Sequence, residues 1–313
     1  MSSKAAPMLP LPRTRYALPS GSVTSRWRGD ERPARPPEGV RPANPLPWGG
    51  GWGEGSPVSE ARHVRARFSR AAHRYDDVAD FQRQMGERLL ATLPHGLPSG
   101  WMLDGGCGTG HGLGLLRRHW PDAEVLALDF AYPMVARATA NSRLCADLQA
   151  LPLANASMEG IWSNLAIQWC NPDAVAREMA RVLKPGGWLA ASTLGPETFR
   201  ELRQAFATVD RYRHTIPFPD PDHVASAFRR VGFIDVQLRR ETLVLHYPDM
   251  VSLLSAVRDL GASRVTGGGR RPGLMGKAAW RRFVSAYELM AESSGLPLSY
   301  DTLCINATLG MGL

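Results

Sequence analysis

Cysteine, lysine and long apolar runs are all scarce in this chain of 313 residues. The four cysteines show neither the paired spacing of a disulfide framework nor the spacing of zinc ligands. We therefore predict a reduced, cytoplasmic protein without a structural metal. No run of about 18 consecutive apolar residues occurs, which argues against a membrane-spanning helix. The 44% of hydrophobic residues is still enough for a folded core, which excludes disorder of the whole chain.

Acidic residues are also fewer than basic ones. The chain has 29 Asp and Glu and 37 Lys and Arg, which gives a net charge of +8. Such a balance suits an acidic partner, which could be nucleic acid, anionic lipid or an acidic protein. Only three of the basic residues are lysines. An excess of arginine suits recognition of phosphate or carboxylate groups, although a GC-rich genome is the more ordinary explanation.

The first 59 residues carry half of that net charge, with eight basic and four acidic residues, and 11 of the 25 prolines. Such a segment cannot bury enough apolar surface to offset its chain entropy, so we predict a disordered tail over residues 1–60. Its prolines argue against the amphipathic helix of an organelle transit peptide, and no apolar signal-peptide core is present. We interpret the tail as a dispensable extension or as a segment upstream of the true start.

From about residue 61 the pattern changes to alternating apolar strands and amphipathic helices. Strands are predicted at residues 101–103, 125–128, 161–164, 188–193, 235–247 and 303–309. Helices are predicted at residues 64–93, 113–119, 133–140, 174–183, 197–209, 223–231, 249–261 and 276–293. This alternation indicates an α/β fold, with a parallel sheet that helices cover on both faces.

A glycine-rich loop follows the first predicted strand, at residues 104–110. Dinucleotide, phosphate and adenosyl ligands all compete for loops of this kind. A phosphate-cradling loop is disfavoured because no Lys followed by Ser or Thr is present. Asp104 opens the loop, and its charge suits a cationic ligand better than a pyrophosphate. Asp129 ends the next strand 19 residues after Gly110, where a carboxylate accepts hydrogen bonds from ribose hydroxyls.

These residues resemble the class I S-adenosylmethionine methyltransferases. The resemblance rests on four motifs in the family's order, at residues 103–110, Asp129, 147–152 and 183–187. It implies a Rossmann-like fold with a mostly parallel, seven-stranded sheet, and S-adenosyl-L-methionine as cofactor.

A narrower resemblance is to the BioC family, the malonyl-acyl-carrier-protein O-methyltransferases of biotin synthesis. The segments that carry it are residues 67–76, 79–80, 82–84, 163–170, 260–262 and 269–270, and it covers about residues 62–310. It implies an N-terminal helical lid at 61–95 and a methyltransferase domain at 96–313, with a helical cap inserted at about 248–298 before the last strand. A related branch, the complex I assembly methyltransferase-like proteins, shares the second half of the pattern and leaves another carboxylate or a protein side chain open as substrate.

The BioC resemblance also implies roles for single residues. Tyr75 would orient the methyl donor or the substrate, Asn164 would face the sulfonium, and Trp169 would form a wall of the acyl pocket. The residues that would contact the cofactor are Asp104, Gly106, Cys107, Gly108, Gly110, Asp129, Phe130, Met134, Asp147, Leu148 and Asn164.

The implied acceptor is the free carboxylate of a malonyl group on an acyl carrier protein. A carboxylate is ionised at neutral pH, so no general base is needed and catalysis would come mainly from alignment. A guanidinium group suits the binding of that carboxylate. The candidates are Arg70, Arg213, Arg264 and Arg270, and the sequence does not choose among them.

For partners, we expect a monomer that binds neither nucleic acid nor membrane, since the modest charge left on residues 60–313 suits an acidic carrier protein. The competing hypothesis is a non-enzymatic protein that binds RNA or a membrane through the basic tail. Aromatic residues interleaved in that tail would serve it, namely Tyr16, Trp27, Trp48 and Trp52. It predicts that deletion of residues 1–59 abolishes function, whereas an enzyme should keep near-normal turnover.

Overall fold

The computed structural model describes residues 65–66, 68–69, 72, 79–93, 100–260, 273 and 275–311. All of them belong to one compact unit, residues 35–313. The predicted tail, Tyr75 and three of the four candidate arginines (Arg70, Arg264 and Arg270) lie outside the described residues. Within the described part of the chain, every helix is too short or too polar to span a bilayer.

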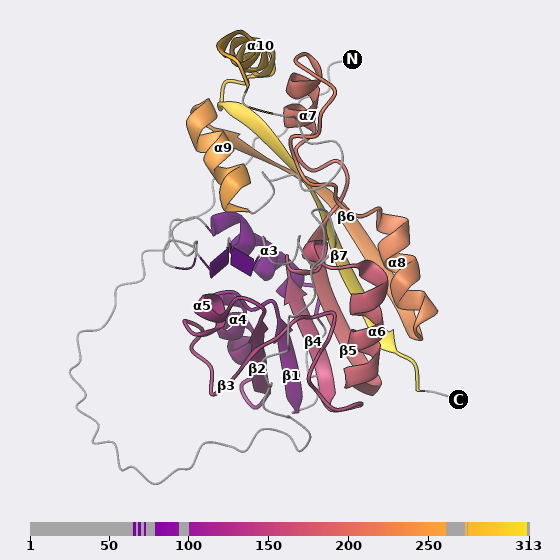
Figure 1. Ribbon diagram of the computed structural model, residues 1–313. Helices are drawn as coiled ribbons and strands as arrows, with labels where there is room; N and C mark the ends of the chain where they lie inside the picture. The colour runs from indigo at the N-terminus through magenta and orange to yellow at the C-terminus, as the bar shows by residue number, and fades with distance from the viewer. Residues whose placement is uncertain are drawn as a thin grey trace, which may run out of the picture. The chain divides into compact units, whose positions relative to one another are not determined.

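The described residues form a seven-stranded sheet in the order β3-β2-β1-β4-β5-β7-β6 (Figure 1). The strands are β1 (Trp101–Gly105), β2 (Glu124–Asp129), β3 (Ser142–Cys145), β4 (Met158–Asn164), β5 (Leu183–Leu194), β6 (Phe233–Tyr247) and β7 (Leu296–Leu309). Strands β1 to β5 pair in parallel, and β7 runs antiparallel to both β5 and β6. The predicted α/β fold with a mostly parallel sheet is confirmed.

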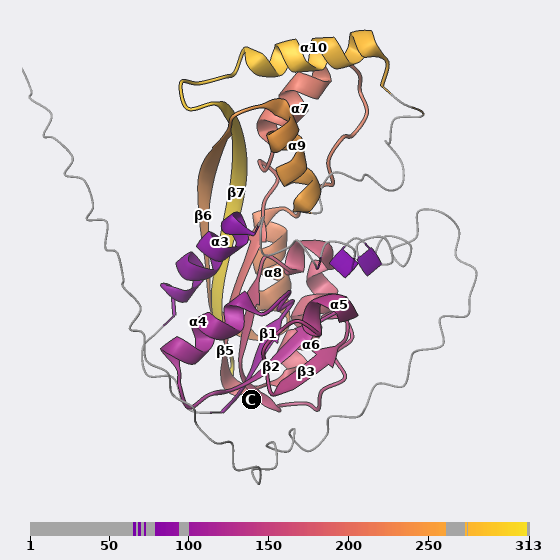
Figure 2. The ribbon, with the colours of Figure 1, turned by 90° about the vertical axis from the view of Figure 1, so that its left-hand side faces the viewer.

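Helices cover both faces of this sheet (Figure 2). They are α3 (Asp80–Leu90), α4 (His111–His119), α5 (Tyr132–Val135), α6 (Pro172–Val182), α7 (Arg200–Ala207), α8 (Pro221–Arg230), α9 (Met250–Asp259) and α10 (Lys277–Glu288), with a 3₁₀ turn at Ile167–Trp169. Asn171 and Asp220 cap α6 and α8 by accepting backbone N–H groups of the first turn. These caps explain why both helices begin two residues before the predicted starts.

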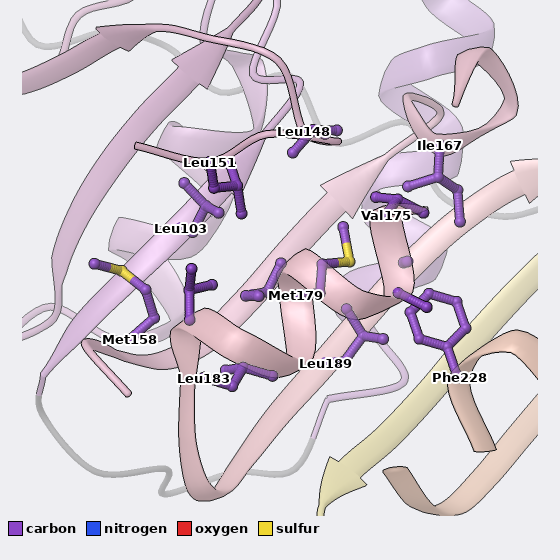
Figure 3. Close-up of a cluster of buried hydrophobic side chains, with 14 of the residues drawn as sticks. Leu103, Leu148, Leu151, Met158, Ile167, Val175, Met179, Leu183, Leu189 and Phe228 are labelled. Atoms are coloured by element: carbon purple, nitrogen blue, oxygen red, sulfur yellow. The ribbon is translucent and has the colours of Figure 1, made fainter. Parts of the chain in front are cut away.

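Two of the apolar clusters lie on opposite faces of the sheet. On one face, α6 and α8 pack side chains such as Met179 and Phe228 over Leu103, Met158 and Leu189 of the strands (Figure 3). On the other face, α3 and α4 bury their leucines against β1 and β4. The sheet is therefore shielded from water on both sides, as its almost unbroken apolar central strands require.

A further apolar cluster joins α7, α9 and α10 to the first half of β7. In sequence, α9 and α10 lie between β6 and β7, where the helical insertion is predicted. Phe81 of α3 stacks on Tyr300 of β7 with ring centroids 4.1 Å apart. Leu165, which follows β4, belongs to the same cluster. This cluster therefore reaches the carboxyl end of the central strands.

Three elements differ from the sequence-based prediction. Strand β3 is missed, because its Ser-Arg-Leu-Cys segment carries little of the β-branched or aromatic pattern that marks strands. Helix α5 is four residues long where residues 133–140 were predicted, and the Arg143 guanidinium binds the carbonyls of Ala136 and Ala138 just beyond it. Strand β7 begins at Leu296, seven residues before the predicted start, because this proline-containing stretch pairs with β6.

Candidate active site

The glycine-rich loop leaves the carboxyl end of β1 and turns into α4. Gly106, Gly108 and Gly110 have φ angles of +81°, +54° and +99°, a region that favours glycine. A Cβ atom on Gly106 would lie 2.2 Å from the Cβ of Ala166. The backbone N–H groups of Gly106 and Cys107 both donate to the carbonyl of Leu128, at 2.7 and 2.9 Å. The loop is thereby fixed to the end of β2, with room for a ligand against its backbone.

Asp129 at the end of β2 forms a hydrogen bond with this loop. One carboxylate oxygen accepts the N–H of Gly108 at 3.0 Å, and the other accepts the N–H of Ala131 at 2.8 Å. Burial raises the pKa of Asp129 to about 6, while these backbone donors act in the opposite direction. Each carboxylate oxygen has a second lone pair, so the group can still accept a ligand hydroxyl.

Asp104 is more deeply buried than Asp129. Its side chain is only 2% exposed, and among the described residues no partner donates to its Oδ2 atom. Burial, together with the nearby charge of Asp129, raises the pKa of Asp104 to about 8. A buried acid without a donor is a costly arrangement, which a cationic ligand group would relieve.

Two cavities meet at this loop. One, the apolar cavity, has walls that include Phe68, Phe130, Met134, Leu148 and Trp169. The other, the polar cavity, has walls that include Gln82, Arg83, Asp104, Thr109, Gly112 and Trp162. Gly106, Gly108 and Asn164 line both. A ligand with one flat apolar end and one charged end would therefore fit across the loop.

Aromatic rings form the walls of the apolar cavity. Phe68 makes edge-on contacts with Phe130 and Trp169, with ring centroids 6.3 and 5.8 Å apart. Asp147 lines the same cavity and accepts the N–H of Gln149 at 2.9 Å. This combination of ring faces and carboxylate oxygens suits a flat base with an exocyclic amino group.

Asn164 stands at the junction of the two cavities, at the end of β4. Its Nδ2 atom donates to the carbonyl of Gln82 at 2.9 Å, and its Oδ1 atom accepts the hydroxyl of Ser192 at 2.7 Å. Both ends of the amide are therefore engaged by protein, and they tie α3 to the sheet.

The structure brings all eleven predicted cofactor residues to the walls of the two cavities, and Trp169 with them. Cys107, which lines the polar cavity, is a protonated thiol, because burial raises its pKa. Arg213 lines a separate pocket beside Phe206 and His214.

Sequence reasoning assigned no role to Phe68, Gln82, Arg83 or Trp162. The first three belong to the N-terminal segment that carries the BioC resemblance, which was the available signal. Trp162 looks like an ordinary core residue of a buried strand, and only its place beside the loop distinguishes it.

Comparison with known proteins agrees with this geometry. A family model described as a methyltransferase domain matches residues 103–191. The malonyl-[acyl-carrier protein] O-methyltransferase of Herminiimonas arsenicoxydans is 43% identical over 254 residues, which cover 80% of this chain and 97% of the relative. The chain belongs to the malonyl-[acyl-carrier protein] O-methyltransferase family. A family member from Dechloromonas aromatica is 42% identical over 81% of this chain and 96% of its own length.

The family and the fold agree, and the protein is an S-adenosylmethionine-dependent methyltransferase. The YcgJ protein of Bacillus subtilis matches 73% of this chain and 99% of its own length with 16% identity and a TM-score of 0.51, a likeness of fold. The site residues fit the cofactor. Asp104, whose Oδ2 atom has no partner within the described part of the chain, suits the ammonium group, Asp129 suits the ribose, and the aromatic walls suit the adenine.

Proposed function

We propose that this member of the family transfers the methyl group of S-adenosyl-L-methionine to the free carboxylate of malonyl-acyl carrier protein. The product would be the malonyl methyl ester that enters biotin (pimeloyl) synthesis. The observation that carries the proposal is the 43% identity along nearly the whole length of the Herminiimonas relative. The name of that relative specifies both the acceptor and the transfer to oxygen.

The bound cofactor would supply a methyl group on a positively charged sulfur that leaves as a neutral thioether. The chain's own residues would hold and align it, with Asp104 at the ammonium group, Asp129 at the ribose, and Phe130, Met134 and Leu148 around the adenine. Alignment of two reactants is worth up to about 7–11 kcal/mol. The acceptor is already an anion, so the protein needs to place it rather than to remove a proton.

Charge neutralises as the methyl group moves from a cation to an anion, and a dry site favours that change. Trp169 and Phe68 exclude water from the apolar cavity, and we propose Trp169 as a wall for the acyl group. Asn164, where the cavities meet, would support the transfer by holding α3 in place. Tyr75 remains a candidate for orienting the reactants.

The proposal extends to the rest of the chain. Helix α3 would belong to the N-terminal lid, and α9 with α10 would cap the acyl pocket. One of the four predicted arginines would bind the malonyl carboxylate. The enzyme would act as a cytoplasmic monomer whose partner is the acidic carrier protein, without nucleic acid or membrane.

The test is incubation of the purified protein with methyl-labelled S-adenosylmethionine and malonyl-acyl carrier protein. Label should enter the acyl group as an ester that mild alkali hydrolyses, and none should enter a carrier with an acetyl group. Label on a protein side chain would favour the complex I assembly-like alternative. Complementation of a biotin auxotroph that lacks this methyltransferase gives an independent measurement in cells.

A further inference from the structure

A third hollow, the basic pocket, lies between α7 and the chain that follows this helix as far as residue 218. The guanidinium groups of Arg203, Arg211 and Arg213 line it, and none of its wall residues belongs to the apolar or the polar cavity. Within the described part of the chain, its wall contains one carboxylate, that of Asp210. The pocket therefore carries a net positive charge and suits an anion.

Two of these arginines are not engaged by the protein itself. Arg211 and Arg213 are exposed, and their side chains form neither an ion pair nor a hydrogen bond with another described residue. Arg203 differs, because its guanidinium donates to the carbonyl of Thr198 and to the Glu197 carboxylate, the latter at 3.5 Å. The pocket thus offers two guanidinium groups that an incoming anion can occupy.

The loop that carries the two arginines is held by its own contacts. One carboxylate oxygen of Asp210 accepts the backbone N–H of Tyr212 at 2.9 Å and lies 2.9 Å from Nε2 of His214. The His214 ring stacks on Phe206 of α7, with ring centroids 3.7 Å apart. The arginines on either side of Tyr212 therefore extend from a fixed loop, which reduces the entropy lost when they bind a ligand.

The basic pocket begins at the same edge of the sheet as the apolar and polar cavities. Beyond β5 the chain continues past the carboxyl end of the parallel strands into α7 (Figure 2). The wall residue Pro196 comes four positions after Ser192, whose hydroxyl donates to Asn164 at 2.7 Å. Four residues span at most about 14 Å. One wall of the pocket is therefore close to Asn164, which lines both cavities.

One apolar cluster contributes side chains to both places. Leu165 of this cluster lines the apolar cavity. Phe206, Ile216 and Phe218 are partly buried against the same cluster and line the basic pocket. A ligand could therefore place an acyl group at the cavity and an anionic group at the pocket while it stays against a single apolar cluster.

The substrate named in the proposed function carries two separate anionic groups. One is the malonyl carboxylate, which must meet the methyl group and so belongs at the cavities. The other is the phosphate ester of the phosphopantetheine arm that bears the thioester. Arginine suits phosphate because its planar guanidinium donates two parallel hydrogen bonds to the phosphate oxygens. Arg213 lies apart from the cavities, so its place favours the second anion over the first.

We propose that the basic pocket binds the phosphate of the substrate's phosphopantetheine arm, with Arg211 and Arg213 as hydrogen-bond donors. The inference rests on the proposed function, because that function supplies the arm. It removes Arg213 from the candidates for the malonyl carboxylate and lets the enzyme select thioesters on a phosphorylated arm. The same phosphate occurs in acyl carrier protein and in coenzyme A, so the test includes both sources.

The experiment measures kcat and KM of the full-length protein for four malonyl thioesters at saturating S-adenosylmethionine. Malonyl-pantetheine lacks the phosphate and malonyl-phosphopantetheine has it. Malonyl-coenzyme A adds a nucleotide, and malonyl-acyl carrier protein adds the protein. The first two compounds differ only in the phosphate, so the ratio of their KM values reports on its recognition. Malonyl-phosphopantetheine should have the lower KM.

Arg211→Gln and Arg213→Gln should each raise KM for the three phosphorylated substrates about fivefold, the effect of one lost exposed ion pair. The double variant should raise it about twenty-five-fold if the two effects add. The kcat values and the KM for malonyl-pantetheine should not change, because the phosphate takes no part in methyl transfer.

Arg239→Gln is the matched control. Arg239 is an exposed arginine on β6 that lines none of the three hollows, and its replacement removes the same charge. This variant should leave the KM ratio of the first two compounds as it is in the unaltered protein. Circular dichroism checks that each variant folds, and the substitutions of exposed side chains should not disturb the core.

Three results would overturn the inference. An equal rise of KM for malonyl-pantetheine and malonyl-phosphopantetheine in Arg213→Gln would mean that Arg213 binds the malonyl carboxylate or acts through the fold. The same change of the ratio in Arg239→Gln would mean that only total charge matters. An effect confined to malonyl-coenzyme A would assign the pocket to the nucleotide instead of the arm.

The failure of the inference and that of the proposed function give different results. Methylation of none of the four thioesters by the unaltered protein would overturn the proposed function, and the inference with it. Normal methylation of malonyl-acyl carrier protein with unchanged KM values in the double variant would overturn the inference alone.

Discussion

The side-chain amide of Asn164 donates a hydrogen bond to the backbone carbonyl of Gln82, 2.9 Å away, and so ties the end of β4 to helix α3. This bond links two segments that are 82 residues apart. The position of helix α3, which carries part of the site, therefore depends on strand β4, which carries another part.

Replacement of Asn164 by Ala should loosen α3 and weaken cofactor binding about tenfold, because a net hydrogen bond is worth about 1 kcal/mol and the hydroxyl of Ser192 loses its acceptor too. Hydrogen exchange should show faster exchange of the α3 amides. Asn171→Ala is the control. It removes the cap of α6 at a cost of about 1 kcal/mol and should leave α3 exchange unchanged. Unaltered α3 exchange in Asn164→Ala would contradict the tie.

Stability without ligand should fall as the pH rises from about 4 to about 8. The pKa of Asp104 is raised from 3.8 to about 8, so in this window the folded protein keeps a proton that the unfolded chain has lost. Asp104→Asn removes the share of this fall that Asp104 causes and leaves the smaller share of Asp129, whose pKa is about 6. The variant should melt at a higher temperature than the unaltered protein at pH 8.5. Thermal melts between pH 5 and pH 9 measure the difference, and identical curves for the two proteins would disprove it.

The same carboxyl group should make cofactor binding depend on pH. The ammonium end of S-adenosylhomocysteine favours ionised Asp104, so its affinity should increase between pH 6 and pH 8 and then level off. Asp104→Asn should bind weakly with little pH dependence. Calorimetry with 5′-methylthioadenosine, which has no ammonium group, provides the control: its affinity should follow only the titration of Asp129 near pH 6 and should stay flat from about pH 7 to pH 8.

Gly106→Ala should abolish cofactor binding. The new Cβ would lie 2.2 Å from that of Ala166, and the residue has a φ of +81° that alanine rarely adopts. Gly276→Ala is a suitable control, since a Cβ there meets nothing within 4 Å. The measurement is the binding of S-adenosylhomocysteine together with a thermal melt. Retention of normal affinity by Gly106→Ala would show that the loop can move aside.

Asp301→Ala should cost about 2–3 kcal/mol of unfolding free energy, because it removes hydrogen bonds to a charged acceptor, while the 46% exposed Arg240 side chain can turn to water. The Asp301 side chain is fully buried and accepts two hydrogen bonds from Arg240, at 2.7 and 2.8 Å. Arg88→Ala breaks the exposed pair with Glu241 and should change stability by about 1 kcal/mol or less. Urea denaturation compares the two variants, and equal losses would contradict the ranking.

Much of the fold follows from local pattern. The run from Trp101 through Gly110 to Asp129 predicts strand, turn, helix and strand because each part carries its own signal of apolar alternation, glycine or terminal acid. The first seven residues of β7 carry a weaker signal, because Leu296, Leu298 and Tyr300 alternate with Pro297, Ser299 and Asp301, and proline and aspartate are unfavourable in strands. Their strand conformation depends on pairing with β6, which the chain reaches only after a 48-residue excursion between Tyr247 and Leu296.

The candidate site likewise contains residues that the sequence predicts and residues that it does not. Asp104 is visible in sequence because it opens a glycine-rich turn, and Asp129 because it ends the next apolar strand. Gln82 and Trp162 are not, since only the folded chain brings them to the walls of one cavity. A pattern in sequence shows which residues can pair, and only the folded chain shows which are left without a partner.

Strands β6 and β7 pair at the rung that joins Tyr247 to Leu296, so the two ends of the segment containing α9 and α10 stand opposite each other in one ladder. Opposed residues in an antiparallel ladder are about 5 Å apart, a gap that a two-residue hairpin turn closes. The segment can therefore be regarded as a replaceable cassette. If α9 and α10 cap the acyl pocket as proposed, exchange of the segment between relatives, or between natural and designed versions, should change the acceptor while the cofactor end of the sheet stays as it is.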